Sequence, residues 1–369
     1  MAITITQSIS GSIYPAYNDS YIKFTSGLTN PIYSEISVPE YTNPFKVYPD
    51  LNNEFLFNFK DIIKAKFNAN GFTDANSNIT TNGQSITGSY NTQDFTITSY
   101  TTSSNEVISG SYEFFKAVKQ VGESTFNNEA QVLAYSENGV DYYITYFEGF
   151  PFTIDLQRIN SASTVNITNL NTNVTGSNLT ASSTNSFRLN IDEATENWTS
   201  TDYLPLLDIL NRLEVRVDDV FKTNINLKKV VGIQDCGGGI YVKWFNNQGS
   251  YSYWLFDEYY KTEIRPSKTY EVTNNSFTNV GSLVNPITNG GYDAEERLVV
   301  KSRFDSNEAN TLRDLFSSPS VQIWSKRQPW QSGEWIDVMI NGSFSSNTKK
   351  KLNDIQAIIK LPQLITPKL

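Results

Sequence analysis

Hydrophobic residues recur at every second position through much of this chain, most clearly between residues 240 and 256. Every second residue from Ile240 to Trp244, and again from Tyr251 to Leu255, is aliphatic or aromatic, and this period of two predicts two β-strands. The four residues between them, Asn-Asn-Gln-Gly, fit a type I turn closed by Gly249, because glycine readily adopts the positive φ needed there. Both faces of the hairpin carry aromatic residues. We therefore expect it either to lie in a core or to present one face to a partner.

The same periodicity predicts further strands along the chain, at residues 3–5, 21–24, 95–100, 107–118, 131–135, 142–147, 152–156, 187–191, 213–217, 227–233, 297–304, 321–323, 336–340 and 352–361. The last of these also fits a helix, and we choose the strand. A long surface loop is expected from Asn70 to Gln93, and a polar hairpin region between residues 160 and 186.

A period near 3.6 predicts two helices. Asn58 is placed to cap the first, which runs to Phe67, and Ser306 is placed to cap the second. The second helix carries apolar residues on one face and ends before Pro319; its face is formed by Ala309, Leu312, Leu315 and Phe316. A short helical turn is also expected at residues 206–213.

These elements predict a mainly β protein, built from β-sandwich-type domains with a C-terminal α+β unit in which a sheet packs on one helix. The length of 369 residues suits about two or three domains. We place an N-terminal β-rich domain with one short helix at residues 1–195. A C-terminal domain at 196–369 then contains the hairpin, followed by a strand, the helix and three more strands.

Composition excludes several kinds of function. The chain has no histidine and a single cysteine, Cys236, so it cannot build His-dependent catalysis, a zinc site of the usual kind or an internal disulfide. A net charge of −9 disfavours nucleic acid as a ligand. Neither a secretory signal nor an apolar run long enough to span a membrane is found, so we expect synthesis in a cytoplasm without a signal peptide. No cofactor or metal is expected.

Carboxylates are the remaining catalytic candidates. Adjacent pairs occur at residues 192–193, 218–219, 257–258 and 295–296, but neighbours on a strand point to opposite faces, so a glycosidase pair would need two strands. The run from Asp74 to Asn78 resembles the start of a calcium loop, yet Ile79 replaces the glycine and Ser85 the bidentate glutamate. We interpret these carboxylates as surface charge and expect no enzyme.

The loop from Lys326 to Trp335 gathers aromatic and cationic residues of the kind found at protein interfaces and sugar sites. Trp330 is the stronger candidate for an exposed anchor, whereas Trp335 either joins it or packs inward at the start of a strand. With Arg327, and with Tyr251 and Trp254 of the hairpin, these residues form the predicted interface.

Several short segments resemble uncharacterised virion proteins of tailed phages that infect Bacteroidota and marine bacteria: residues 14–19, 57–63, 236–237 with 241–246 and Gly249, and 312–323 with 335–341. Such proteins are usually placed at the tail tip or baseplate. The resemblance implies a non-enzymatic virion component that is repeated around the tail axis and contacts its own copies and other tail proteins. It implies no active residues.

The predicted function is therefore that of a structural protein in a phage tail tip or baseplate, working as a homo-oligomer through protein–protein contacts. The alternatives are a carbohydrate-binding adhesin or receptor-binding module that touches a host surface glycan, and a polysaccharide depolymerase. A ring with large buried interfaces favours the first, exposed coplanar aromatic residues the second, and a cleft with facing carboxylates the third.

Overall fold

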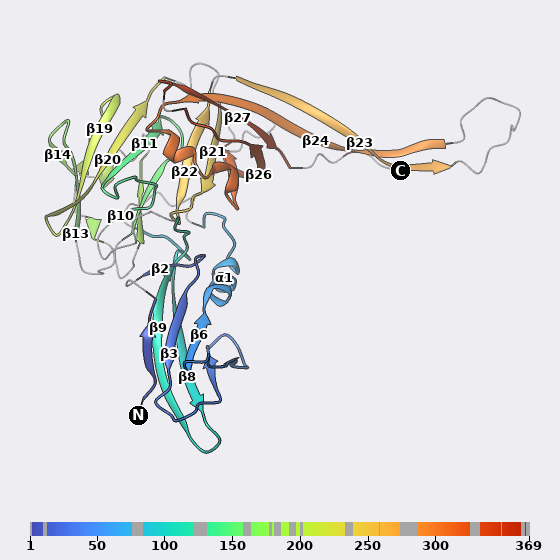
Figure 1. Cartoon of the computed structure of the whole chain (residues 1–369). Coiled ribbons are helices and arrows are strands. Elements are labelled where there is room, and N and C mark those ends of the chain that lie inside the picture. The colour runs from blue at the N-terminus through green and yellow to red at the C-terminus, as the bar shows by residue number, and fades with distance from the viewer. Residues whose placement is uncertain are drawn as a thin grey trace, which may run out of the picture. The chain divides into compact units, whose positions relative to one another are not determined.

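The computed structural model describes residues 2–9, 13–75, 84–120, 131–157, 164–176, 179–180, 186–191, 197–199, 202–232, 239–257, 259–273, 287–324, 333–347, 349–362 and 366 (Figure 1). Strands take up 55% of the chain and helices 6%, which confirms the mainly β prediction.

The chain divides into two compact units, and the division is not a single cut. Unit 1 contains residues 1–229 together with 245–251, and unit 2 contains residues 230–244 and 252–369. The boundary expected between residues 195 and 196 lies within unit 1. The predicted hairpin is present as β21 (Ile240–Phe245) and β22 (Tyr251–Phe256), so its tip belongs to unit 1 and its stem to unit 2.

The first part of unit 1 is a sandwich of two sheets. One has the order β1 (Thr4–Gln7), β3 (Tyr21–Thr25), β6 (Glu54–Asn58), and the other the order β2 (Tyr14–Pro15), β9 (Asn105–Phe115), β8 (Tyr90–Tyr100), β4 (Tyr33–Ser37), β5 (Phe45–Val47). Helix α1 (Lys60–Asn68) shares their core, to which it contributes Ile62, Ile63 and Phe67. The N-cap position of α1 is Phe59 and not the predicted Asn58, which lies one residue earlier; Asn58 Oδ1 nevertheless accepts the N–H of Lys60 at 3.0 Å.

The second part of unit 1 contains two larger sheets and a short pair. The first sheet has the order β10 (Gln131–Val132), β12 (Thr153–Gln157), β16 (Ser186–Asn190), β7 (Gln84–Ser85). The second has the order β11 (Asp141–Phe147), β20 (Val220–Val230), β19 (Ile209–Val217), β13 (Thr164–Asn169), β14 (Val174–Thr175), and β15 (Leu179–Thr180) also pairs with β13. The short pair is β17 (Asn197–Thr199) with β18 (Asp202–Tyr203). Strands β7 and β8 begin inside the loop expected from Asn70 to Gln93.

The helical turn expected at residues 206–213 is wrong, because β19 occupies most of it. Leu213 and Val215 are buried whereas Arg212 is exposed, so the side chains alternate between the two faces of the sheet through this segment. Pairing with β13 on one side and β20 on the other satisfies the backbone of β19.

The hairpin tip is bonded into unit 1 beside a buried ion cluster. Arg188 of β16 binds Asp155 of β12 through Nε at 2.8 Å and Nη2 at 2.9 Å, and its Nη1 lies 2.9 Å from Asp74. The three side chains are at most 2% exposed. Ser250 of the tip donates its hydroxyl to the same Asp155, and the Tyr251 hydroxyl donates to a backbone carbonyl at 3.1 Å. The tip therefore completes the polar core of unit 1.

Unit 2 is a seven-stranded sheet around a short helical segment. The order is β22, β21, β25 (Val321–Trp324), β26 (Trp335–Gly342), β27 (Asn353–Lys360), β24 (Ile287–Phe304), β23 (Tyr259–Thr273). The sheet curls, since Trp254 Nε1 of β22 donates to Ser302 Oγ of β24 at 2.7 Å. Helix α2 (Ala309–Leu312) and the 3-10 turn η2 (Leu315–Ser317) contribute the buried Ala309, Leu312 and Leu315, as expected for the α+β unit. The strand chosen for residues 352–361 is confirmed as β27.

The expected cap of the second helix is wrong. Asp305 Oδ1, and not Ser306, accepts the N–H groups of Asn307 and Glu308, and Glu308 Oε2 in turn accepts the N–H of Asp305 at 2.9 Å. This is a reciprocal capping box one residue earlier than predicted.

Candidate assembly interface

Two of the predicted interface residues, Trp330 and Arg327, lie outside the described residues. Trp335 begins β26 and is half-buried. Its ring centroid lies 5.2 Å from that of Trp324 and 5.8 Å from that of Tyr241, and the Nζ of Lys243 is 4.2 Å from it. Trp335 therefore joins an aromatic cluster on the sheet of unit 2.

The two predicted interface residues of the hairpin, Trp254 and Tyr251, do not belong to this aromatic cluster. Trp254 is 2% exposed and its indole N–H is bonded to Ser302, so its ring lies in the core of unit 2. Tyr251 belongs to unit 1, where its ring lies 5.5 Å from the guanidinium of Arg188. These positions agree with the core alternative that the sequence left open for the hairpin.

The longest exposed feature of unit 2 is a ribbon made by β23 and β24. The strands pair from Tyr259 with Lys301 to Thr273 with Ile287, whereas β27 pairs with β24 only from Arg297 onward. Beyond that point the two strands pair only with each other and extend past the rest of unit 2 (Figure 1). We call this part, residues 263–273 and 287–297, the ribbon. Because a two-stranded ribbon is at best marginally stable in water, an exposed one favours a partner surface.

One face of the ribbon is charged. Glu263 is bonded to Lys261 at 3.0 Å and to Arg265 at 2.9 Å, and on β24 Arg297 is bonded to Glu295. The bonds from Lys261 and then Arg265 lower the pKa of Glu263 below its ordinary value. This face continues the outer face of the sheet and is solvated.

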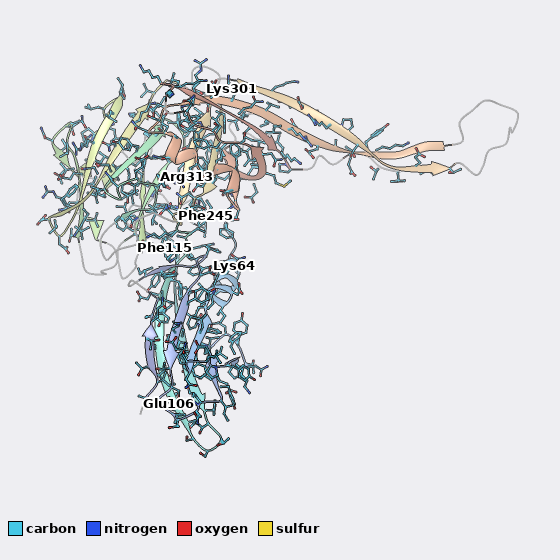
Figure 2. All side chains as sticks on the ribbon, viewed as in Figure 1. Lys64, Glu106, Phe115, Phe245, Lys301 and Arg313 are labelled. Carbon is cyan, nitrogen blue, oxygen red and sulfur yellow. The ribbon has the colours of Figure 1, made fainter. Side chains whose placement is uncertain are left out.

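The opposite face of the ribbon is mainly apolar, and we call it the apolar face; it also carries Glu296 and Lys268. Register places Ile264 opposite Glu296, Pro266 opposite Ala294 and Tyr292 opposite Lys268, all on the side that carries Leu298 and Val300 within the sheet. Leu298 and Val300 are buried there, but Ile264 is 62% and Tyr292 50% exposed. Ile264 and Tyr292 therefore lie in solvent on the ribbon, along which side chains project beyond Lys301 (Figure 2).

The two edges of the ribbon differ. Strand β23 is the outer edge and carries Pro266, which has no N–H, together with Lys261 and Lys268, which are common devices against edge-to-edge pairing. The edge of β24 faces its own sheet, and the carbonyl of Tyr292 accepts a bond from the Thr366 hydroxyl. The apolar face, and not an edge, is therefore the open surface of the ribbon.

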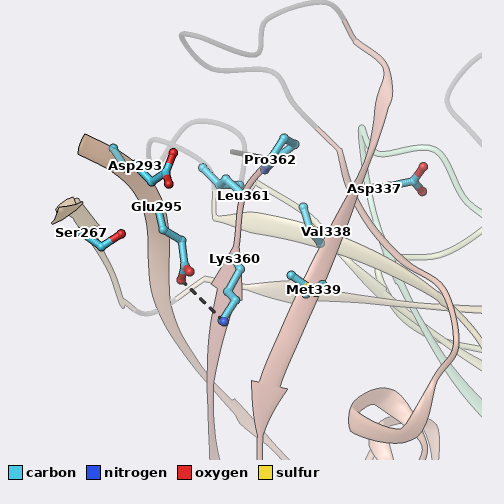
Figure 3. A pocket seen from close by; sticks show the side chains of 10 residues that line it. Ser267, Asp293, Glu295, Asp337, Val338, Met339, Lys360, Leu361 and Pro362 are labelled. Carbon is cyan, nitrogen blue, oxygen red and sulfur yellow. Dashed lines mark ion pairs between the residues drawn. The ribbon is translucent and has the colours of Figure 1, made fainter. Parts of the chain in front are cut away.

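A groove of about 450 Å³ lies at the base of the ribbon, where β27 ends and both its neighbours continue (Figure 3). Asp293, Glu295 and Asp337 line it, and Lys360 Nζ lies 3.7 Å from Glu295 (Figure 3). Asp337 is held by Gln322 at 2.8 Å. Glu295 is bonded to both Arg297 and Lys360, so Asp293 and Asp337 are the other acidic groups of the groove.

Other kinds of site find little support in the described part of the chain. There, no three acidic, cysteine or histidine side chains form a metal-binding group. Asp74, considered above as a calcium ligand, is instead bonded to Arg188. No helix among the described residues is long and apolar enough to cross a membrane.

Sequence reasoning missed most of the ribbon, because it placed a strand only from Arg297. A signal was present: the charged Lys261, Glu263 and Arg265 alternate with Thr262 and Ile264. Pro266 argued against a strand, but an edge strand tolerates it.

Comparisons with known proteins do not assign the chain to a family. No protein-family model matches the chain, and no curated protein matches it. Solved structures that match include the fibronectin(III)-like modules of CbhA from Clostridium thermocellum, with 9% identity over 62% of this chain and 93% of that one and a TM-score of 0.20. A bacterial ice-binding adhesin gives 8% identity over 62% of each chain and a TM-score of 0.21. Domains 4–9 of the surface-layer protein SbsC give 8% identity over 100% of this chain and 46% of that one, also at 0.21. At these TM-scores the likenesses say nothing about function.

Proposed function

We propose that this protein is a structural component that assembles with neighbouring subunits through the apolar face of its ribbon. The observation that carries the proposal is the exposure of Ile264 and Tyr292 on a two-stranded element that no other described strand supports. An extended apolar surface of this kind marks an interaction site in a soluble protein. The resemblance to virion proteins leads us to propose the tail tip or baseplate of a tailed phage as the assembly.

The charged face and the groove fit the same role. The ion pairs among Lys261, Glu263 and Arg265 keep one side of the ribbon in water, so a partner is directed to the other side. The carboxylates of the groove would receive a cation at the base of the ribbon, and such a contact adds specificity more than affinity. Binding and positioning require no catalytic group, and we propose that the protein is not an enzyme.

The experiment compares the full chain with a double variant, Ile264→Ser with Tyr292→Ser, by light scattering over a range of concentrations. Burying the exposed part of each side chain removes roughly 100 Å² from water and contributes about 2.5 kcal/mol. We therefore expect the double variant to weaken association at least about 100-fold. The matched control is Val107→Ser, which removes a 59% exposed aliphatic residue from β9 of unit 1 and should leave association unchanged.

Unchanged association of the double variant, with unchanged circular dichroism, would show that the ribbon is not the assembly surface. A wild-type chain that stays monomeric at every concentration, alone and with tail proteins, and that binds a glycan would favour an adhesin instead. The tail location is tested separately by mass spectrometry of purified virions that carry a tagged copy of the chain.

A further inference from the structure

One sheet of unit 1 carries a row of tyrosines that the proposed function does not use. The sheet is the one formed by β2, β9, β8, β4 and β5, and its register places Tyr33 of β4 directly opposite Tyr100 of β8. Their rings stack with centroids 4.9 Å apart, and the ring of Tyr48, which follows β5, lies 6.5 Å from that of Tyr33. We call these three residues the tyrosine row. It crosses three neighbouring strands.

The tyrosine row lies on the outer face of the sheet. Ile36 of β4 and Ile97 of β8 are 0% exposed and belong to the core of the sandwich. Successive side chains of a strand point to opposite faces, so Tyr33 and Tyr100, each three residues from one of these isoleucines, are on the other side. Both are half-buried against each other, whereas Tyr48 is 66% exposed. The row is therefore open to a ligand, mainly through Tyr48.

The neighbouring strands hold the row in place. The Nζ of Lys46 on β5 lies 3.8 Å from the centroid of the Tyr33 ring. Because β5 and β8 are the two neighbours of β4, the Tyr33 ring is packed between Lys46 on one side and Tyr100 on the other. Side chains that are already fixed lose little conformational entropy when a ligand binds.

A hollow of about 560 Å³ lies on the same face. Its outward-facing side chains are short and polar, namely Ser37, Asp94, Thr96, Ser109 and Ser111. Ser37 and Thr96 are each four residues from a tyrosine of the row on the same strand, so the hollow opens on the face that carries the row. The hydroxyls of Thr96 and Ser109 share a hydrogen bond at 2.9 Å. The hollow is thus lined by hydroxyl groups and one carboxylate.

The row and the hollow form one continuous track. Asp94 at one end and Tyr100 at the other are six residues apart on β8, which corresponds to roughly 20 Å. Between them, Glu35 of β4 lies opposite Lys46 of β5, so the middle of the track carries one charge of each sign. A track of this length can receive a chain of several sugar rings.

We infer that this face of unit 1 binds a neutral oligosaccharide in an extended conformation, a function separate from assembly through the ribbon. The exposed ring of Tyr48 can pack on the C–H groups of a sugar, while serine, threonine and aspartate exchange hydrogen bonds with its hydroxyls. Serine and aspartate are depleted in protein interfaces, so the hollow suits a hydroxylated ligand better than a protein. The net charge of −9 disfavours an anionic polysaccharide.

The test applies the full-length chain to an array of neutral oligosaccharides of glucose, galactose, mannose and N-acetylhexosamines, with heparin as the anionic probe. We expect the wild-type chain to bind at least one neutral oligosaccharide, and Tyr48→Ala to weaken that binding about tenfold because it removes the stacking ring. Ser111→Ile, which places a strand-forming side chain in the hollow, should also weaken it. The matched control is Tyr21→Ala, which removes a 45% exposed tyrosine from β3 of the other sheet and should bind like the wild-type chain.

The outcomes separate this inference from the proposed function. No bound neutral oligosaccharide, binding to heparin alone, or equal binding by Tyr48→Ala and Tyr21→Ala at unchanged melting temperature would overturn the inference and leave assembly through the ribbon standing. Loss of self-association in Tyr48→Ala, measured by light scattering, would show that the face is a protein interface instead. The double variant Ile264→Ser with Tyr292→Ser should still bind the oligosaccharide, because its substitutions lie in unit 2.

Discussion

Replacement of Arg188 by methionine should destabilise unit 1 strongly. Arg188 is 1% exposed in its side chain and binds two carboxylates, Asp155 in a bidentate manner and Asp74 through Nη1, which are themselves at most 2% exposed. The substitution keeps most of the side-chain volume and removes the charge that both carboxylates face. Breaking a buried ion pair on one side costs about 3–5 kcal/mol, since the remaining charge is left without compensation.

The control is Arg216→Met, which breaks a pair with Glu214 where the arginine is 44% exposed. A pair in this position contributes less than about 1 kcal/mol, because water screens it. Both variants contain the same substitution on strands of unit 1, so their difference measures burial of the pair and not the change of residue.

Urea unfolding followed by two signals assigns the effect to a unit. Five of the six tryptophans, all except Trp198, belong to unit 2, so tryptophan fluorescence mainly follows unit 2 while circular dichroism follows both. With a slope near 2 kcal/mol per molar urea, Arg188→Met should move the unit 1 transition by roughly 2 M. A shift no larger than that of Arg216→Met would refute the reasoning, because it would mean that water already compensates the carboxylates.

Two further predictions concern a turn and an acid limb. Gly249→Ala should lower the free energy of unfolding by about 2–4 kcal/mol, since φ there is +90° and the new Cβ would lie 2.7 Å from a backbone carbonyl oxygen. The control is Gly232→Ala, with φ +77° and no atom within 4 Å, which should lower it by only about 1 kcal/mol. Thermal melts of the two variants measure the difference. Hydrogen bonds from Asn138 and Asn224 hold the pKa of Asp141 below its ordinary value, so its contribution to stability is present above that value and is lost as pH falls through the lowered one. In Asp141→Asn the free energy of unfolding should therefore fall less steeply below about pH 4 than in the wild-type chain. The same pH dependence in both proteins would contradict this.

The hairpin and the helices show how far local pattern reaches. Alternation and Gly249 were enough to predict β21, β22 and their turn, because both signals lie within a few residues. The sequence predicted a side-chain cap at the N-terminus of α2 but assigned it to Ser306, although the spacing of Asp305 and Glu308 is that of a capping box. At residues 206–213, several leucines in a short segment suggested a helical turn, whereas pairing with β13 and β20 makes a strand.

The candidate interface was less predictable, for a physical reason. Aromatic residues such as Trp254 and Tyr251 were candidates by residue type, but type does not reveal that a ring is enclosed by strands far away in sequence. Ile264 and Ile209 drew no notice, since isoleucine in a strand is ordinarily a core residue. The structure shows that both lie in solvent, with Ile264 62% and Ile209 74% exposed.

The hairpin also affects when unit 1 can finish folding during synthesis of the chain. Residues 245–251 supply Ser250 and Tyr251 to the polar core of unit 1, although the rest of that unit ends at residue 229. During synthesis, unit 1 therefore remains incomplete until the ribosome has released the chain past residue 251, by which time the first strand of unit 2 has also emerged. A gene fragment ending at residue 229 would therefore encode unit 1 without the hairpin tip that completes its polar core.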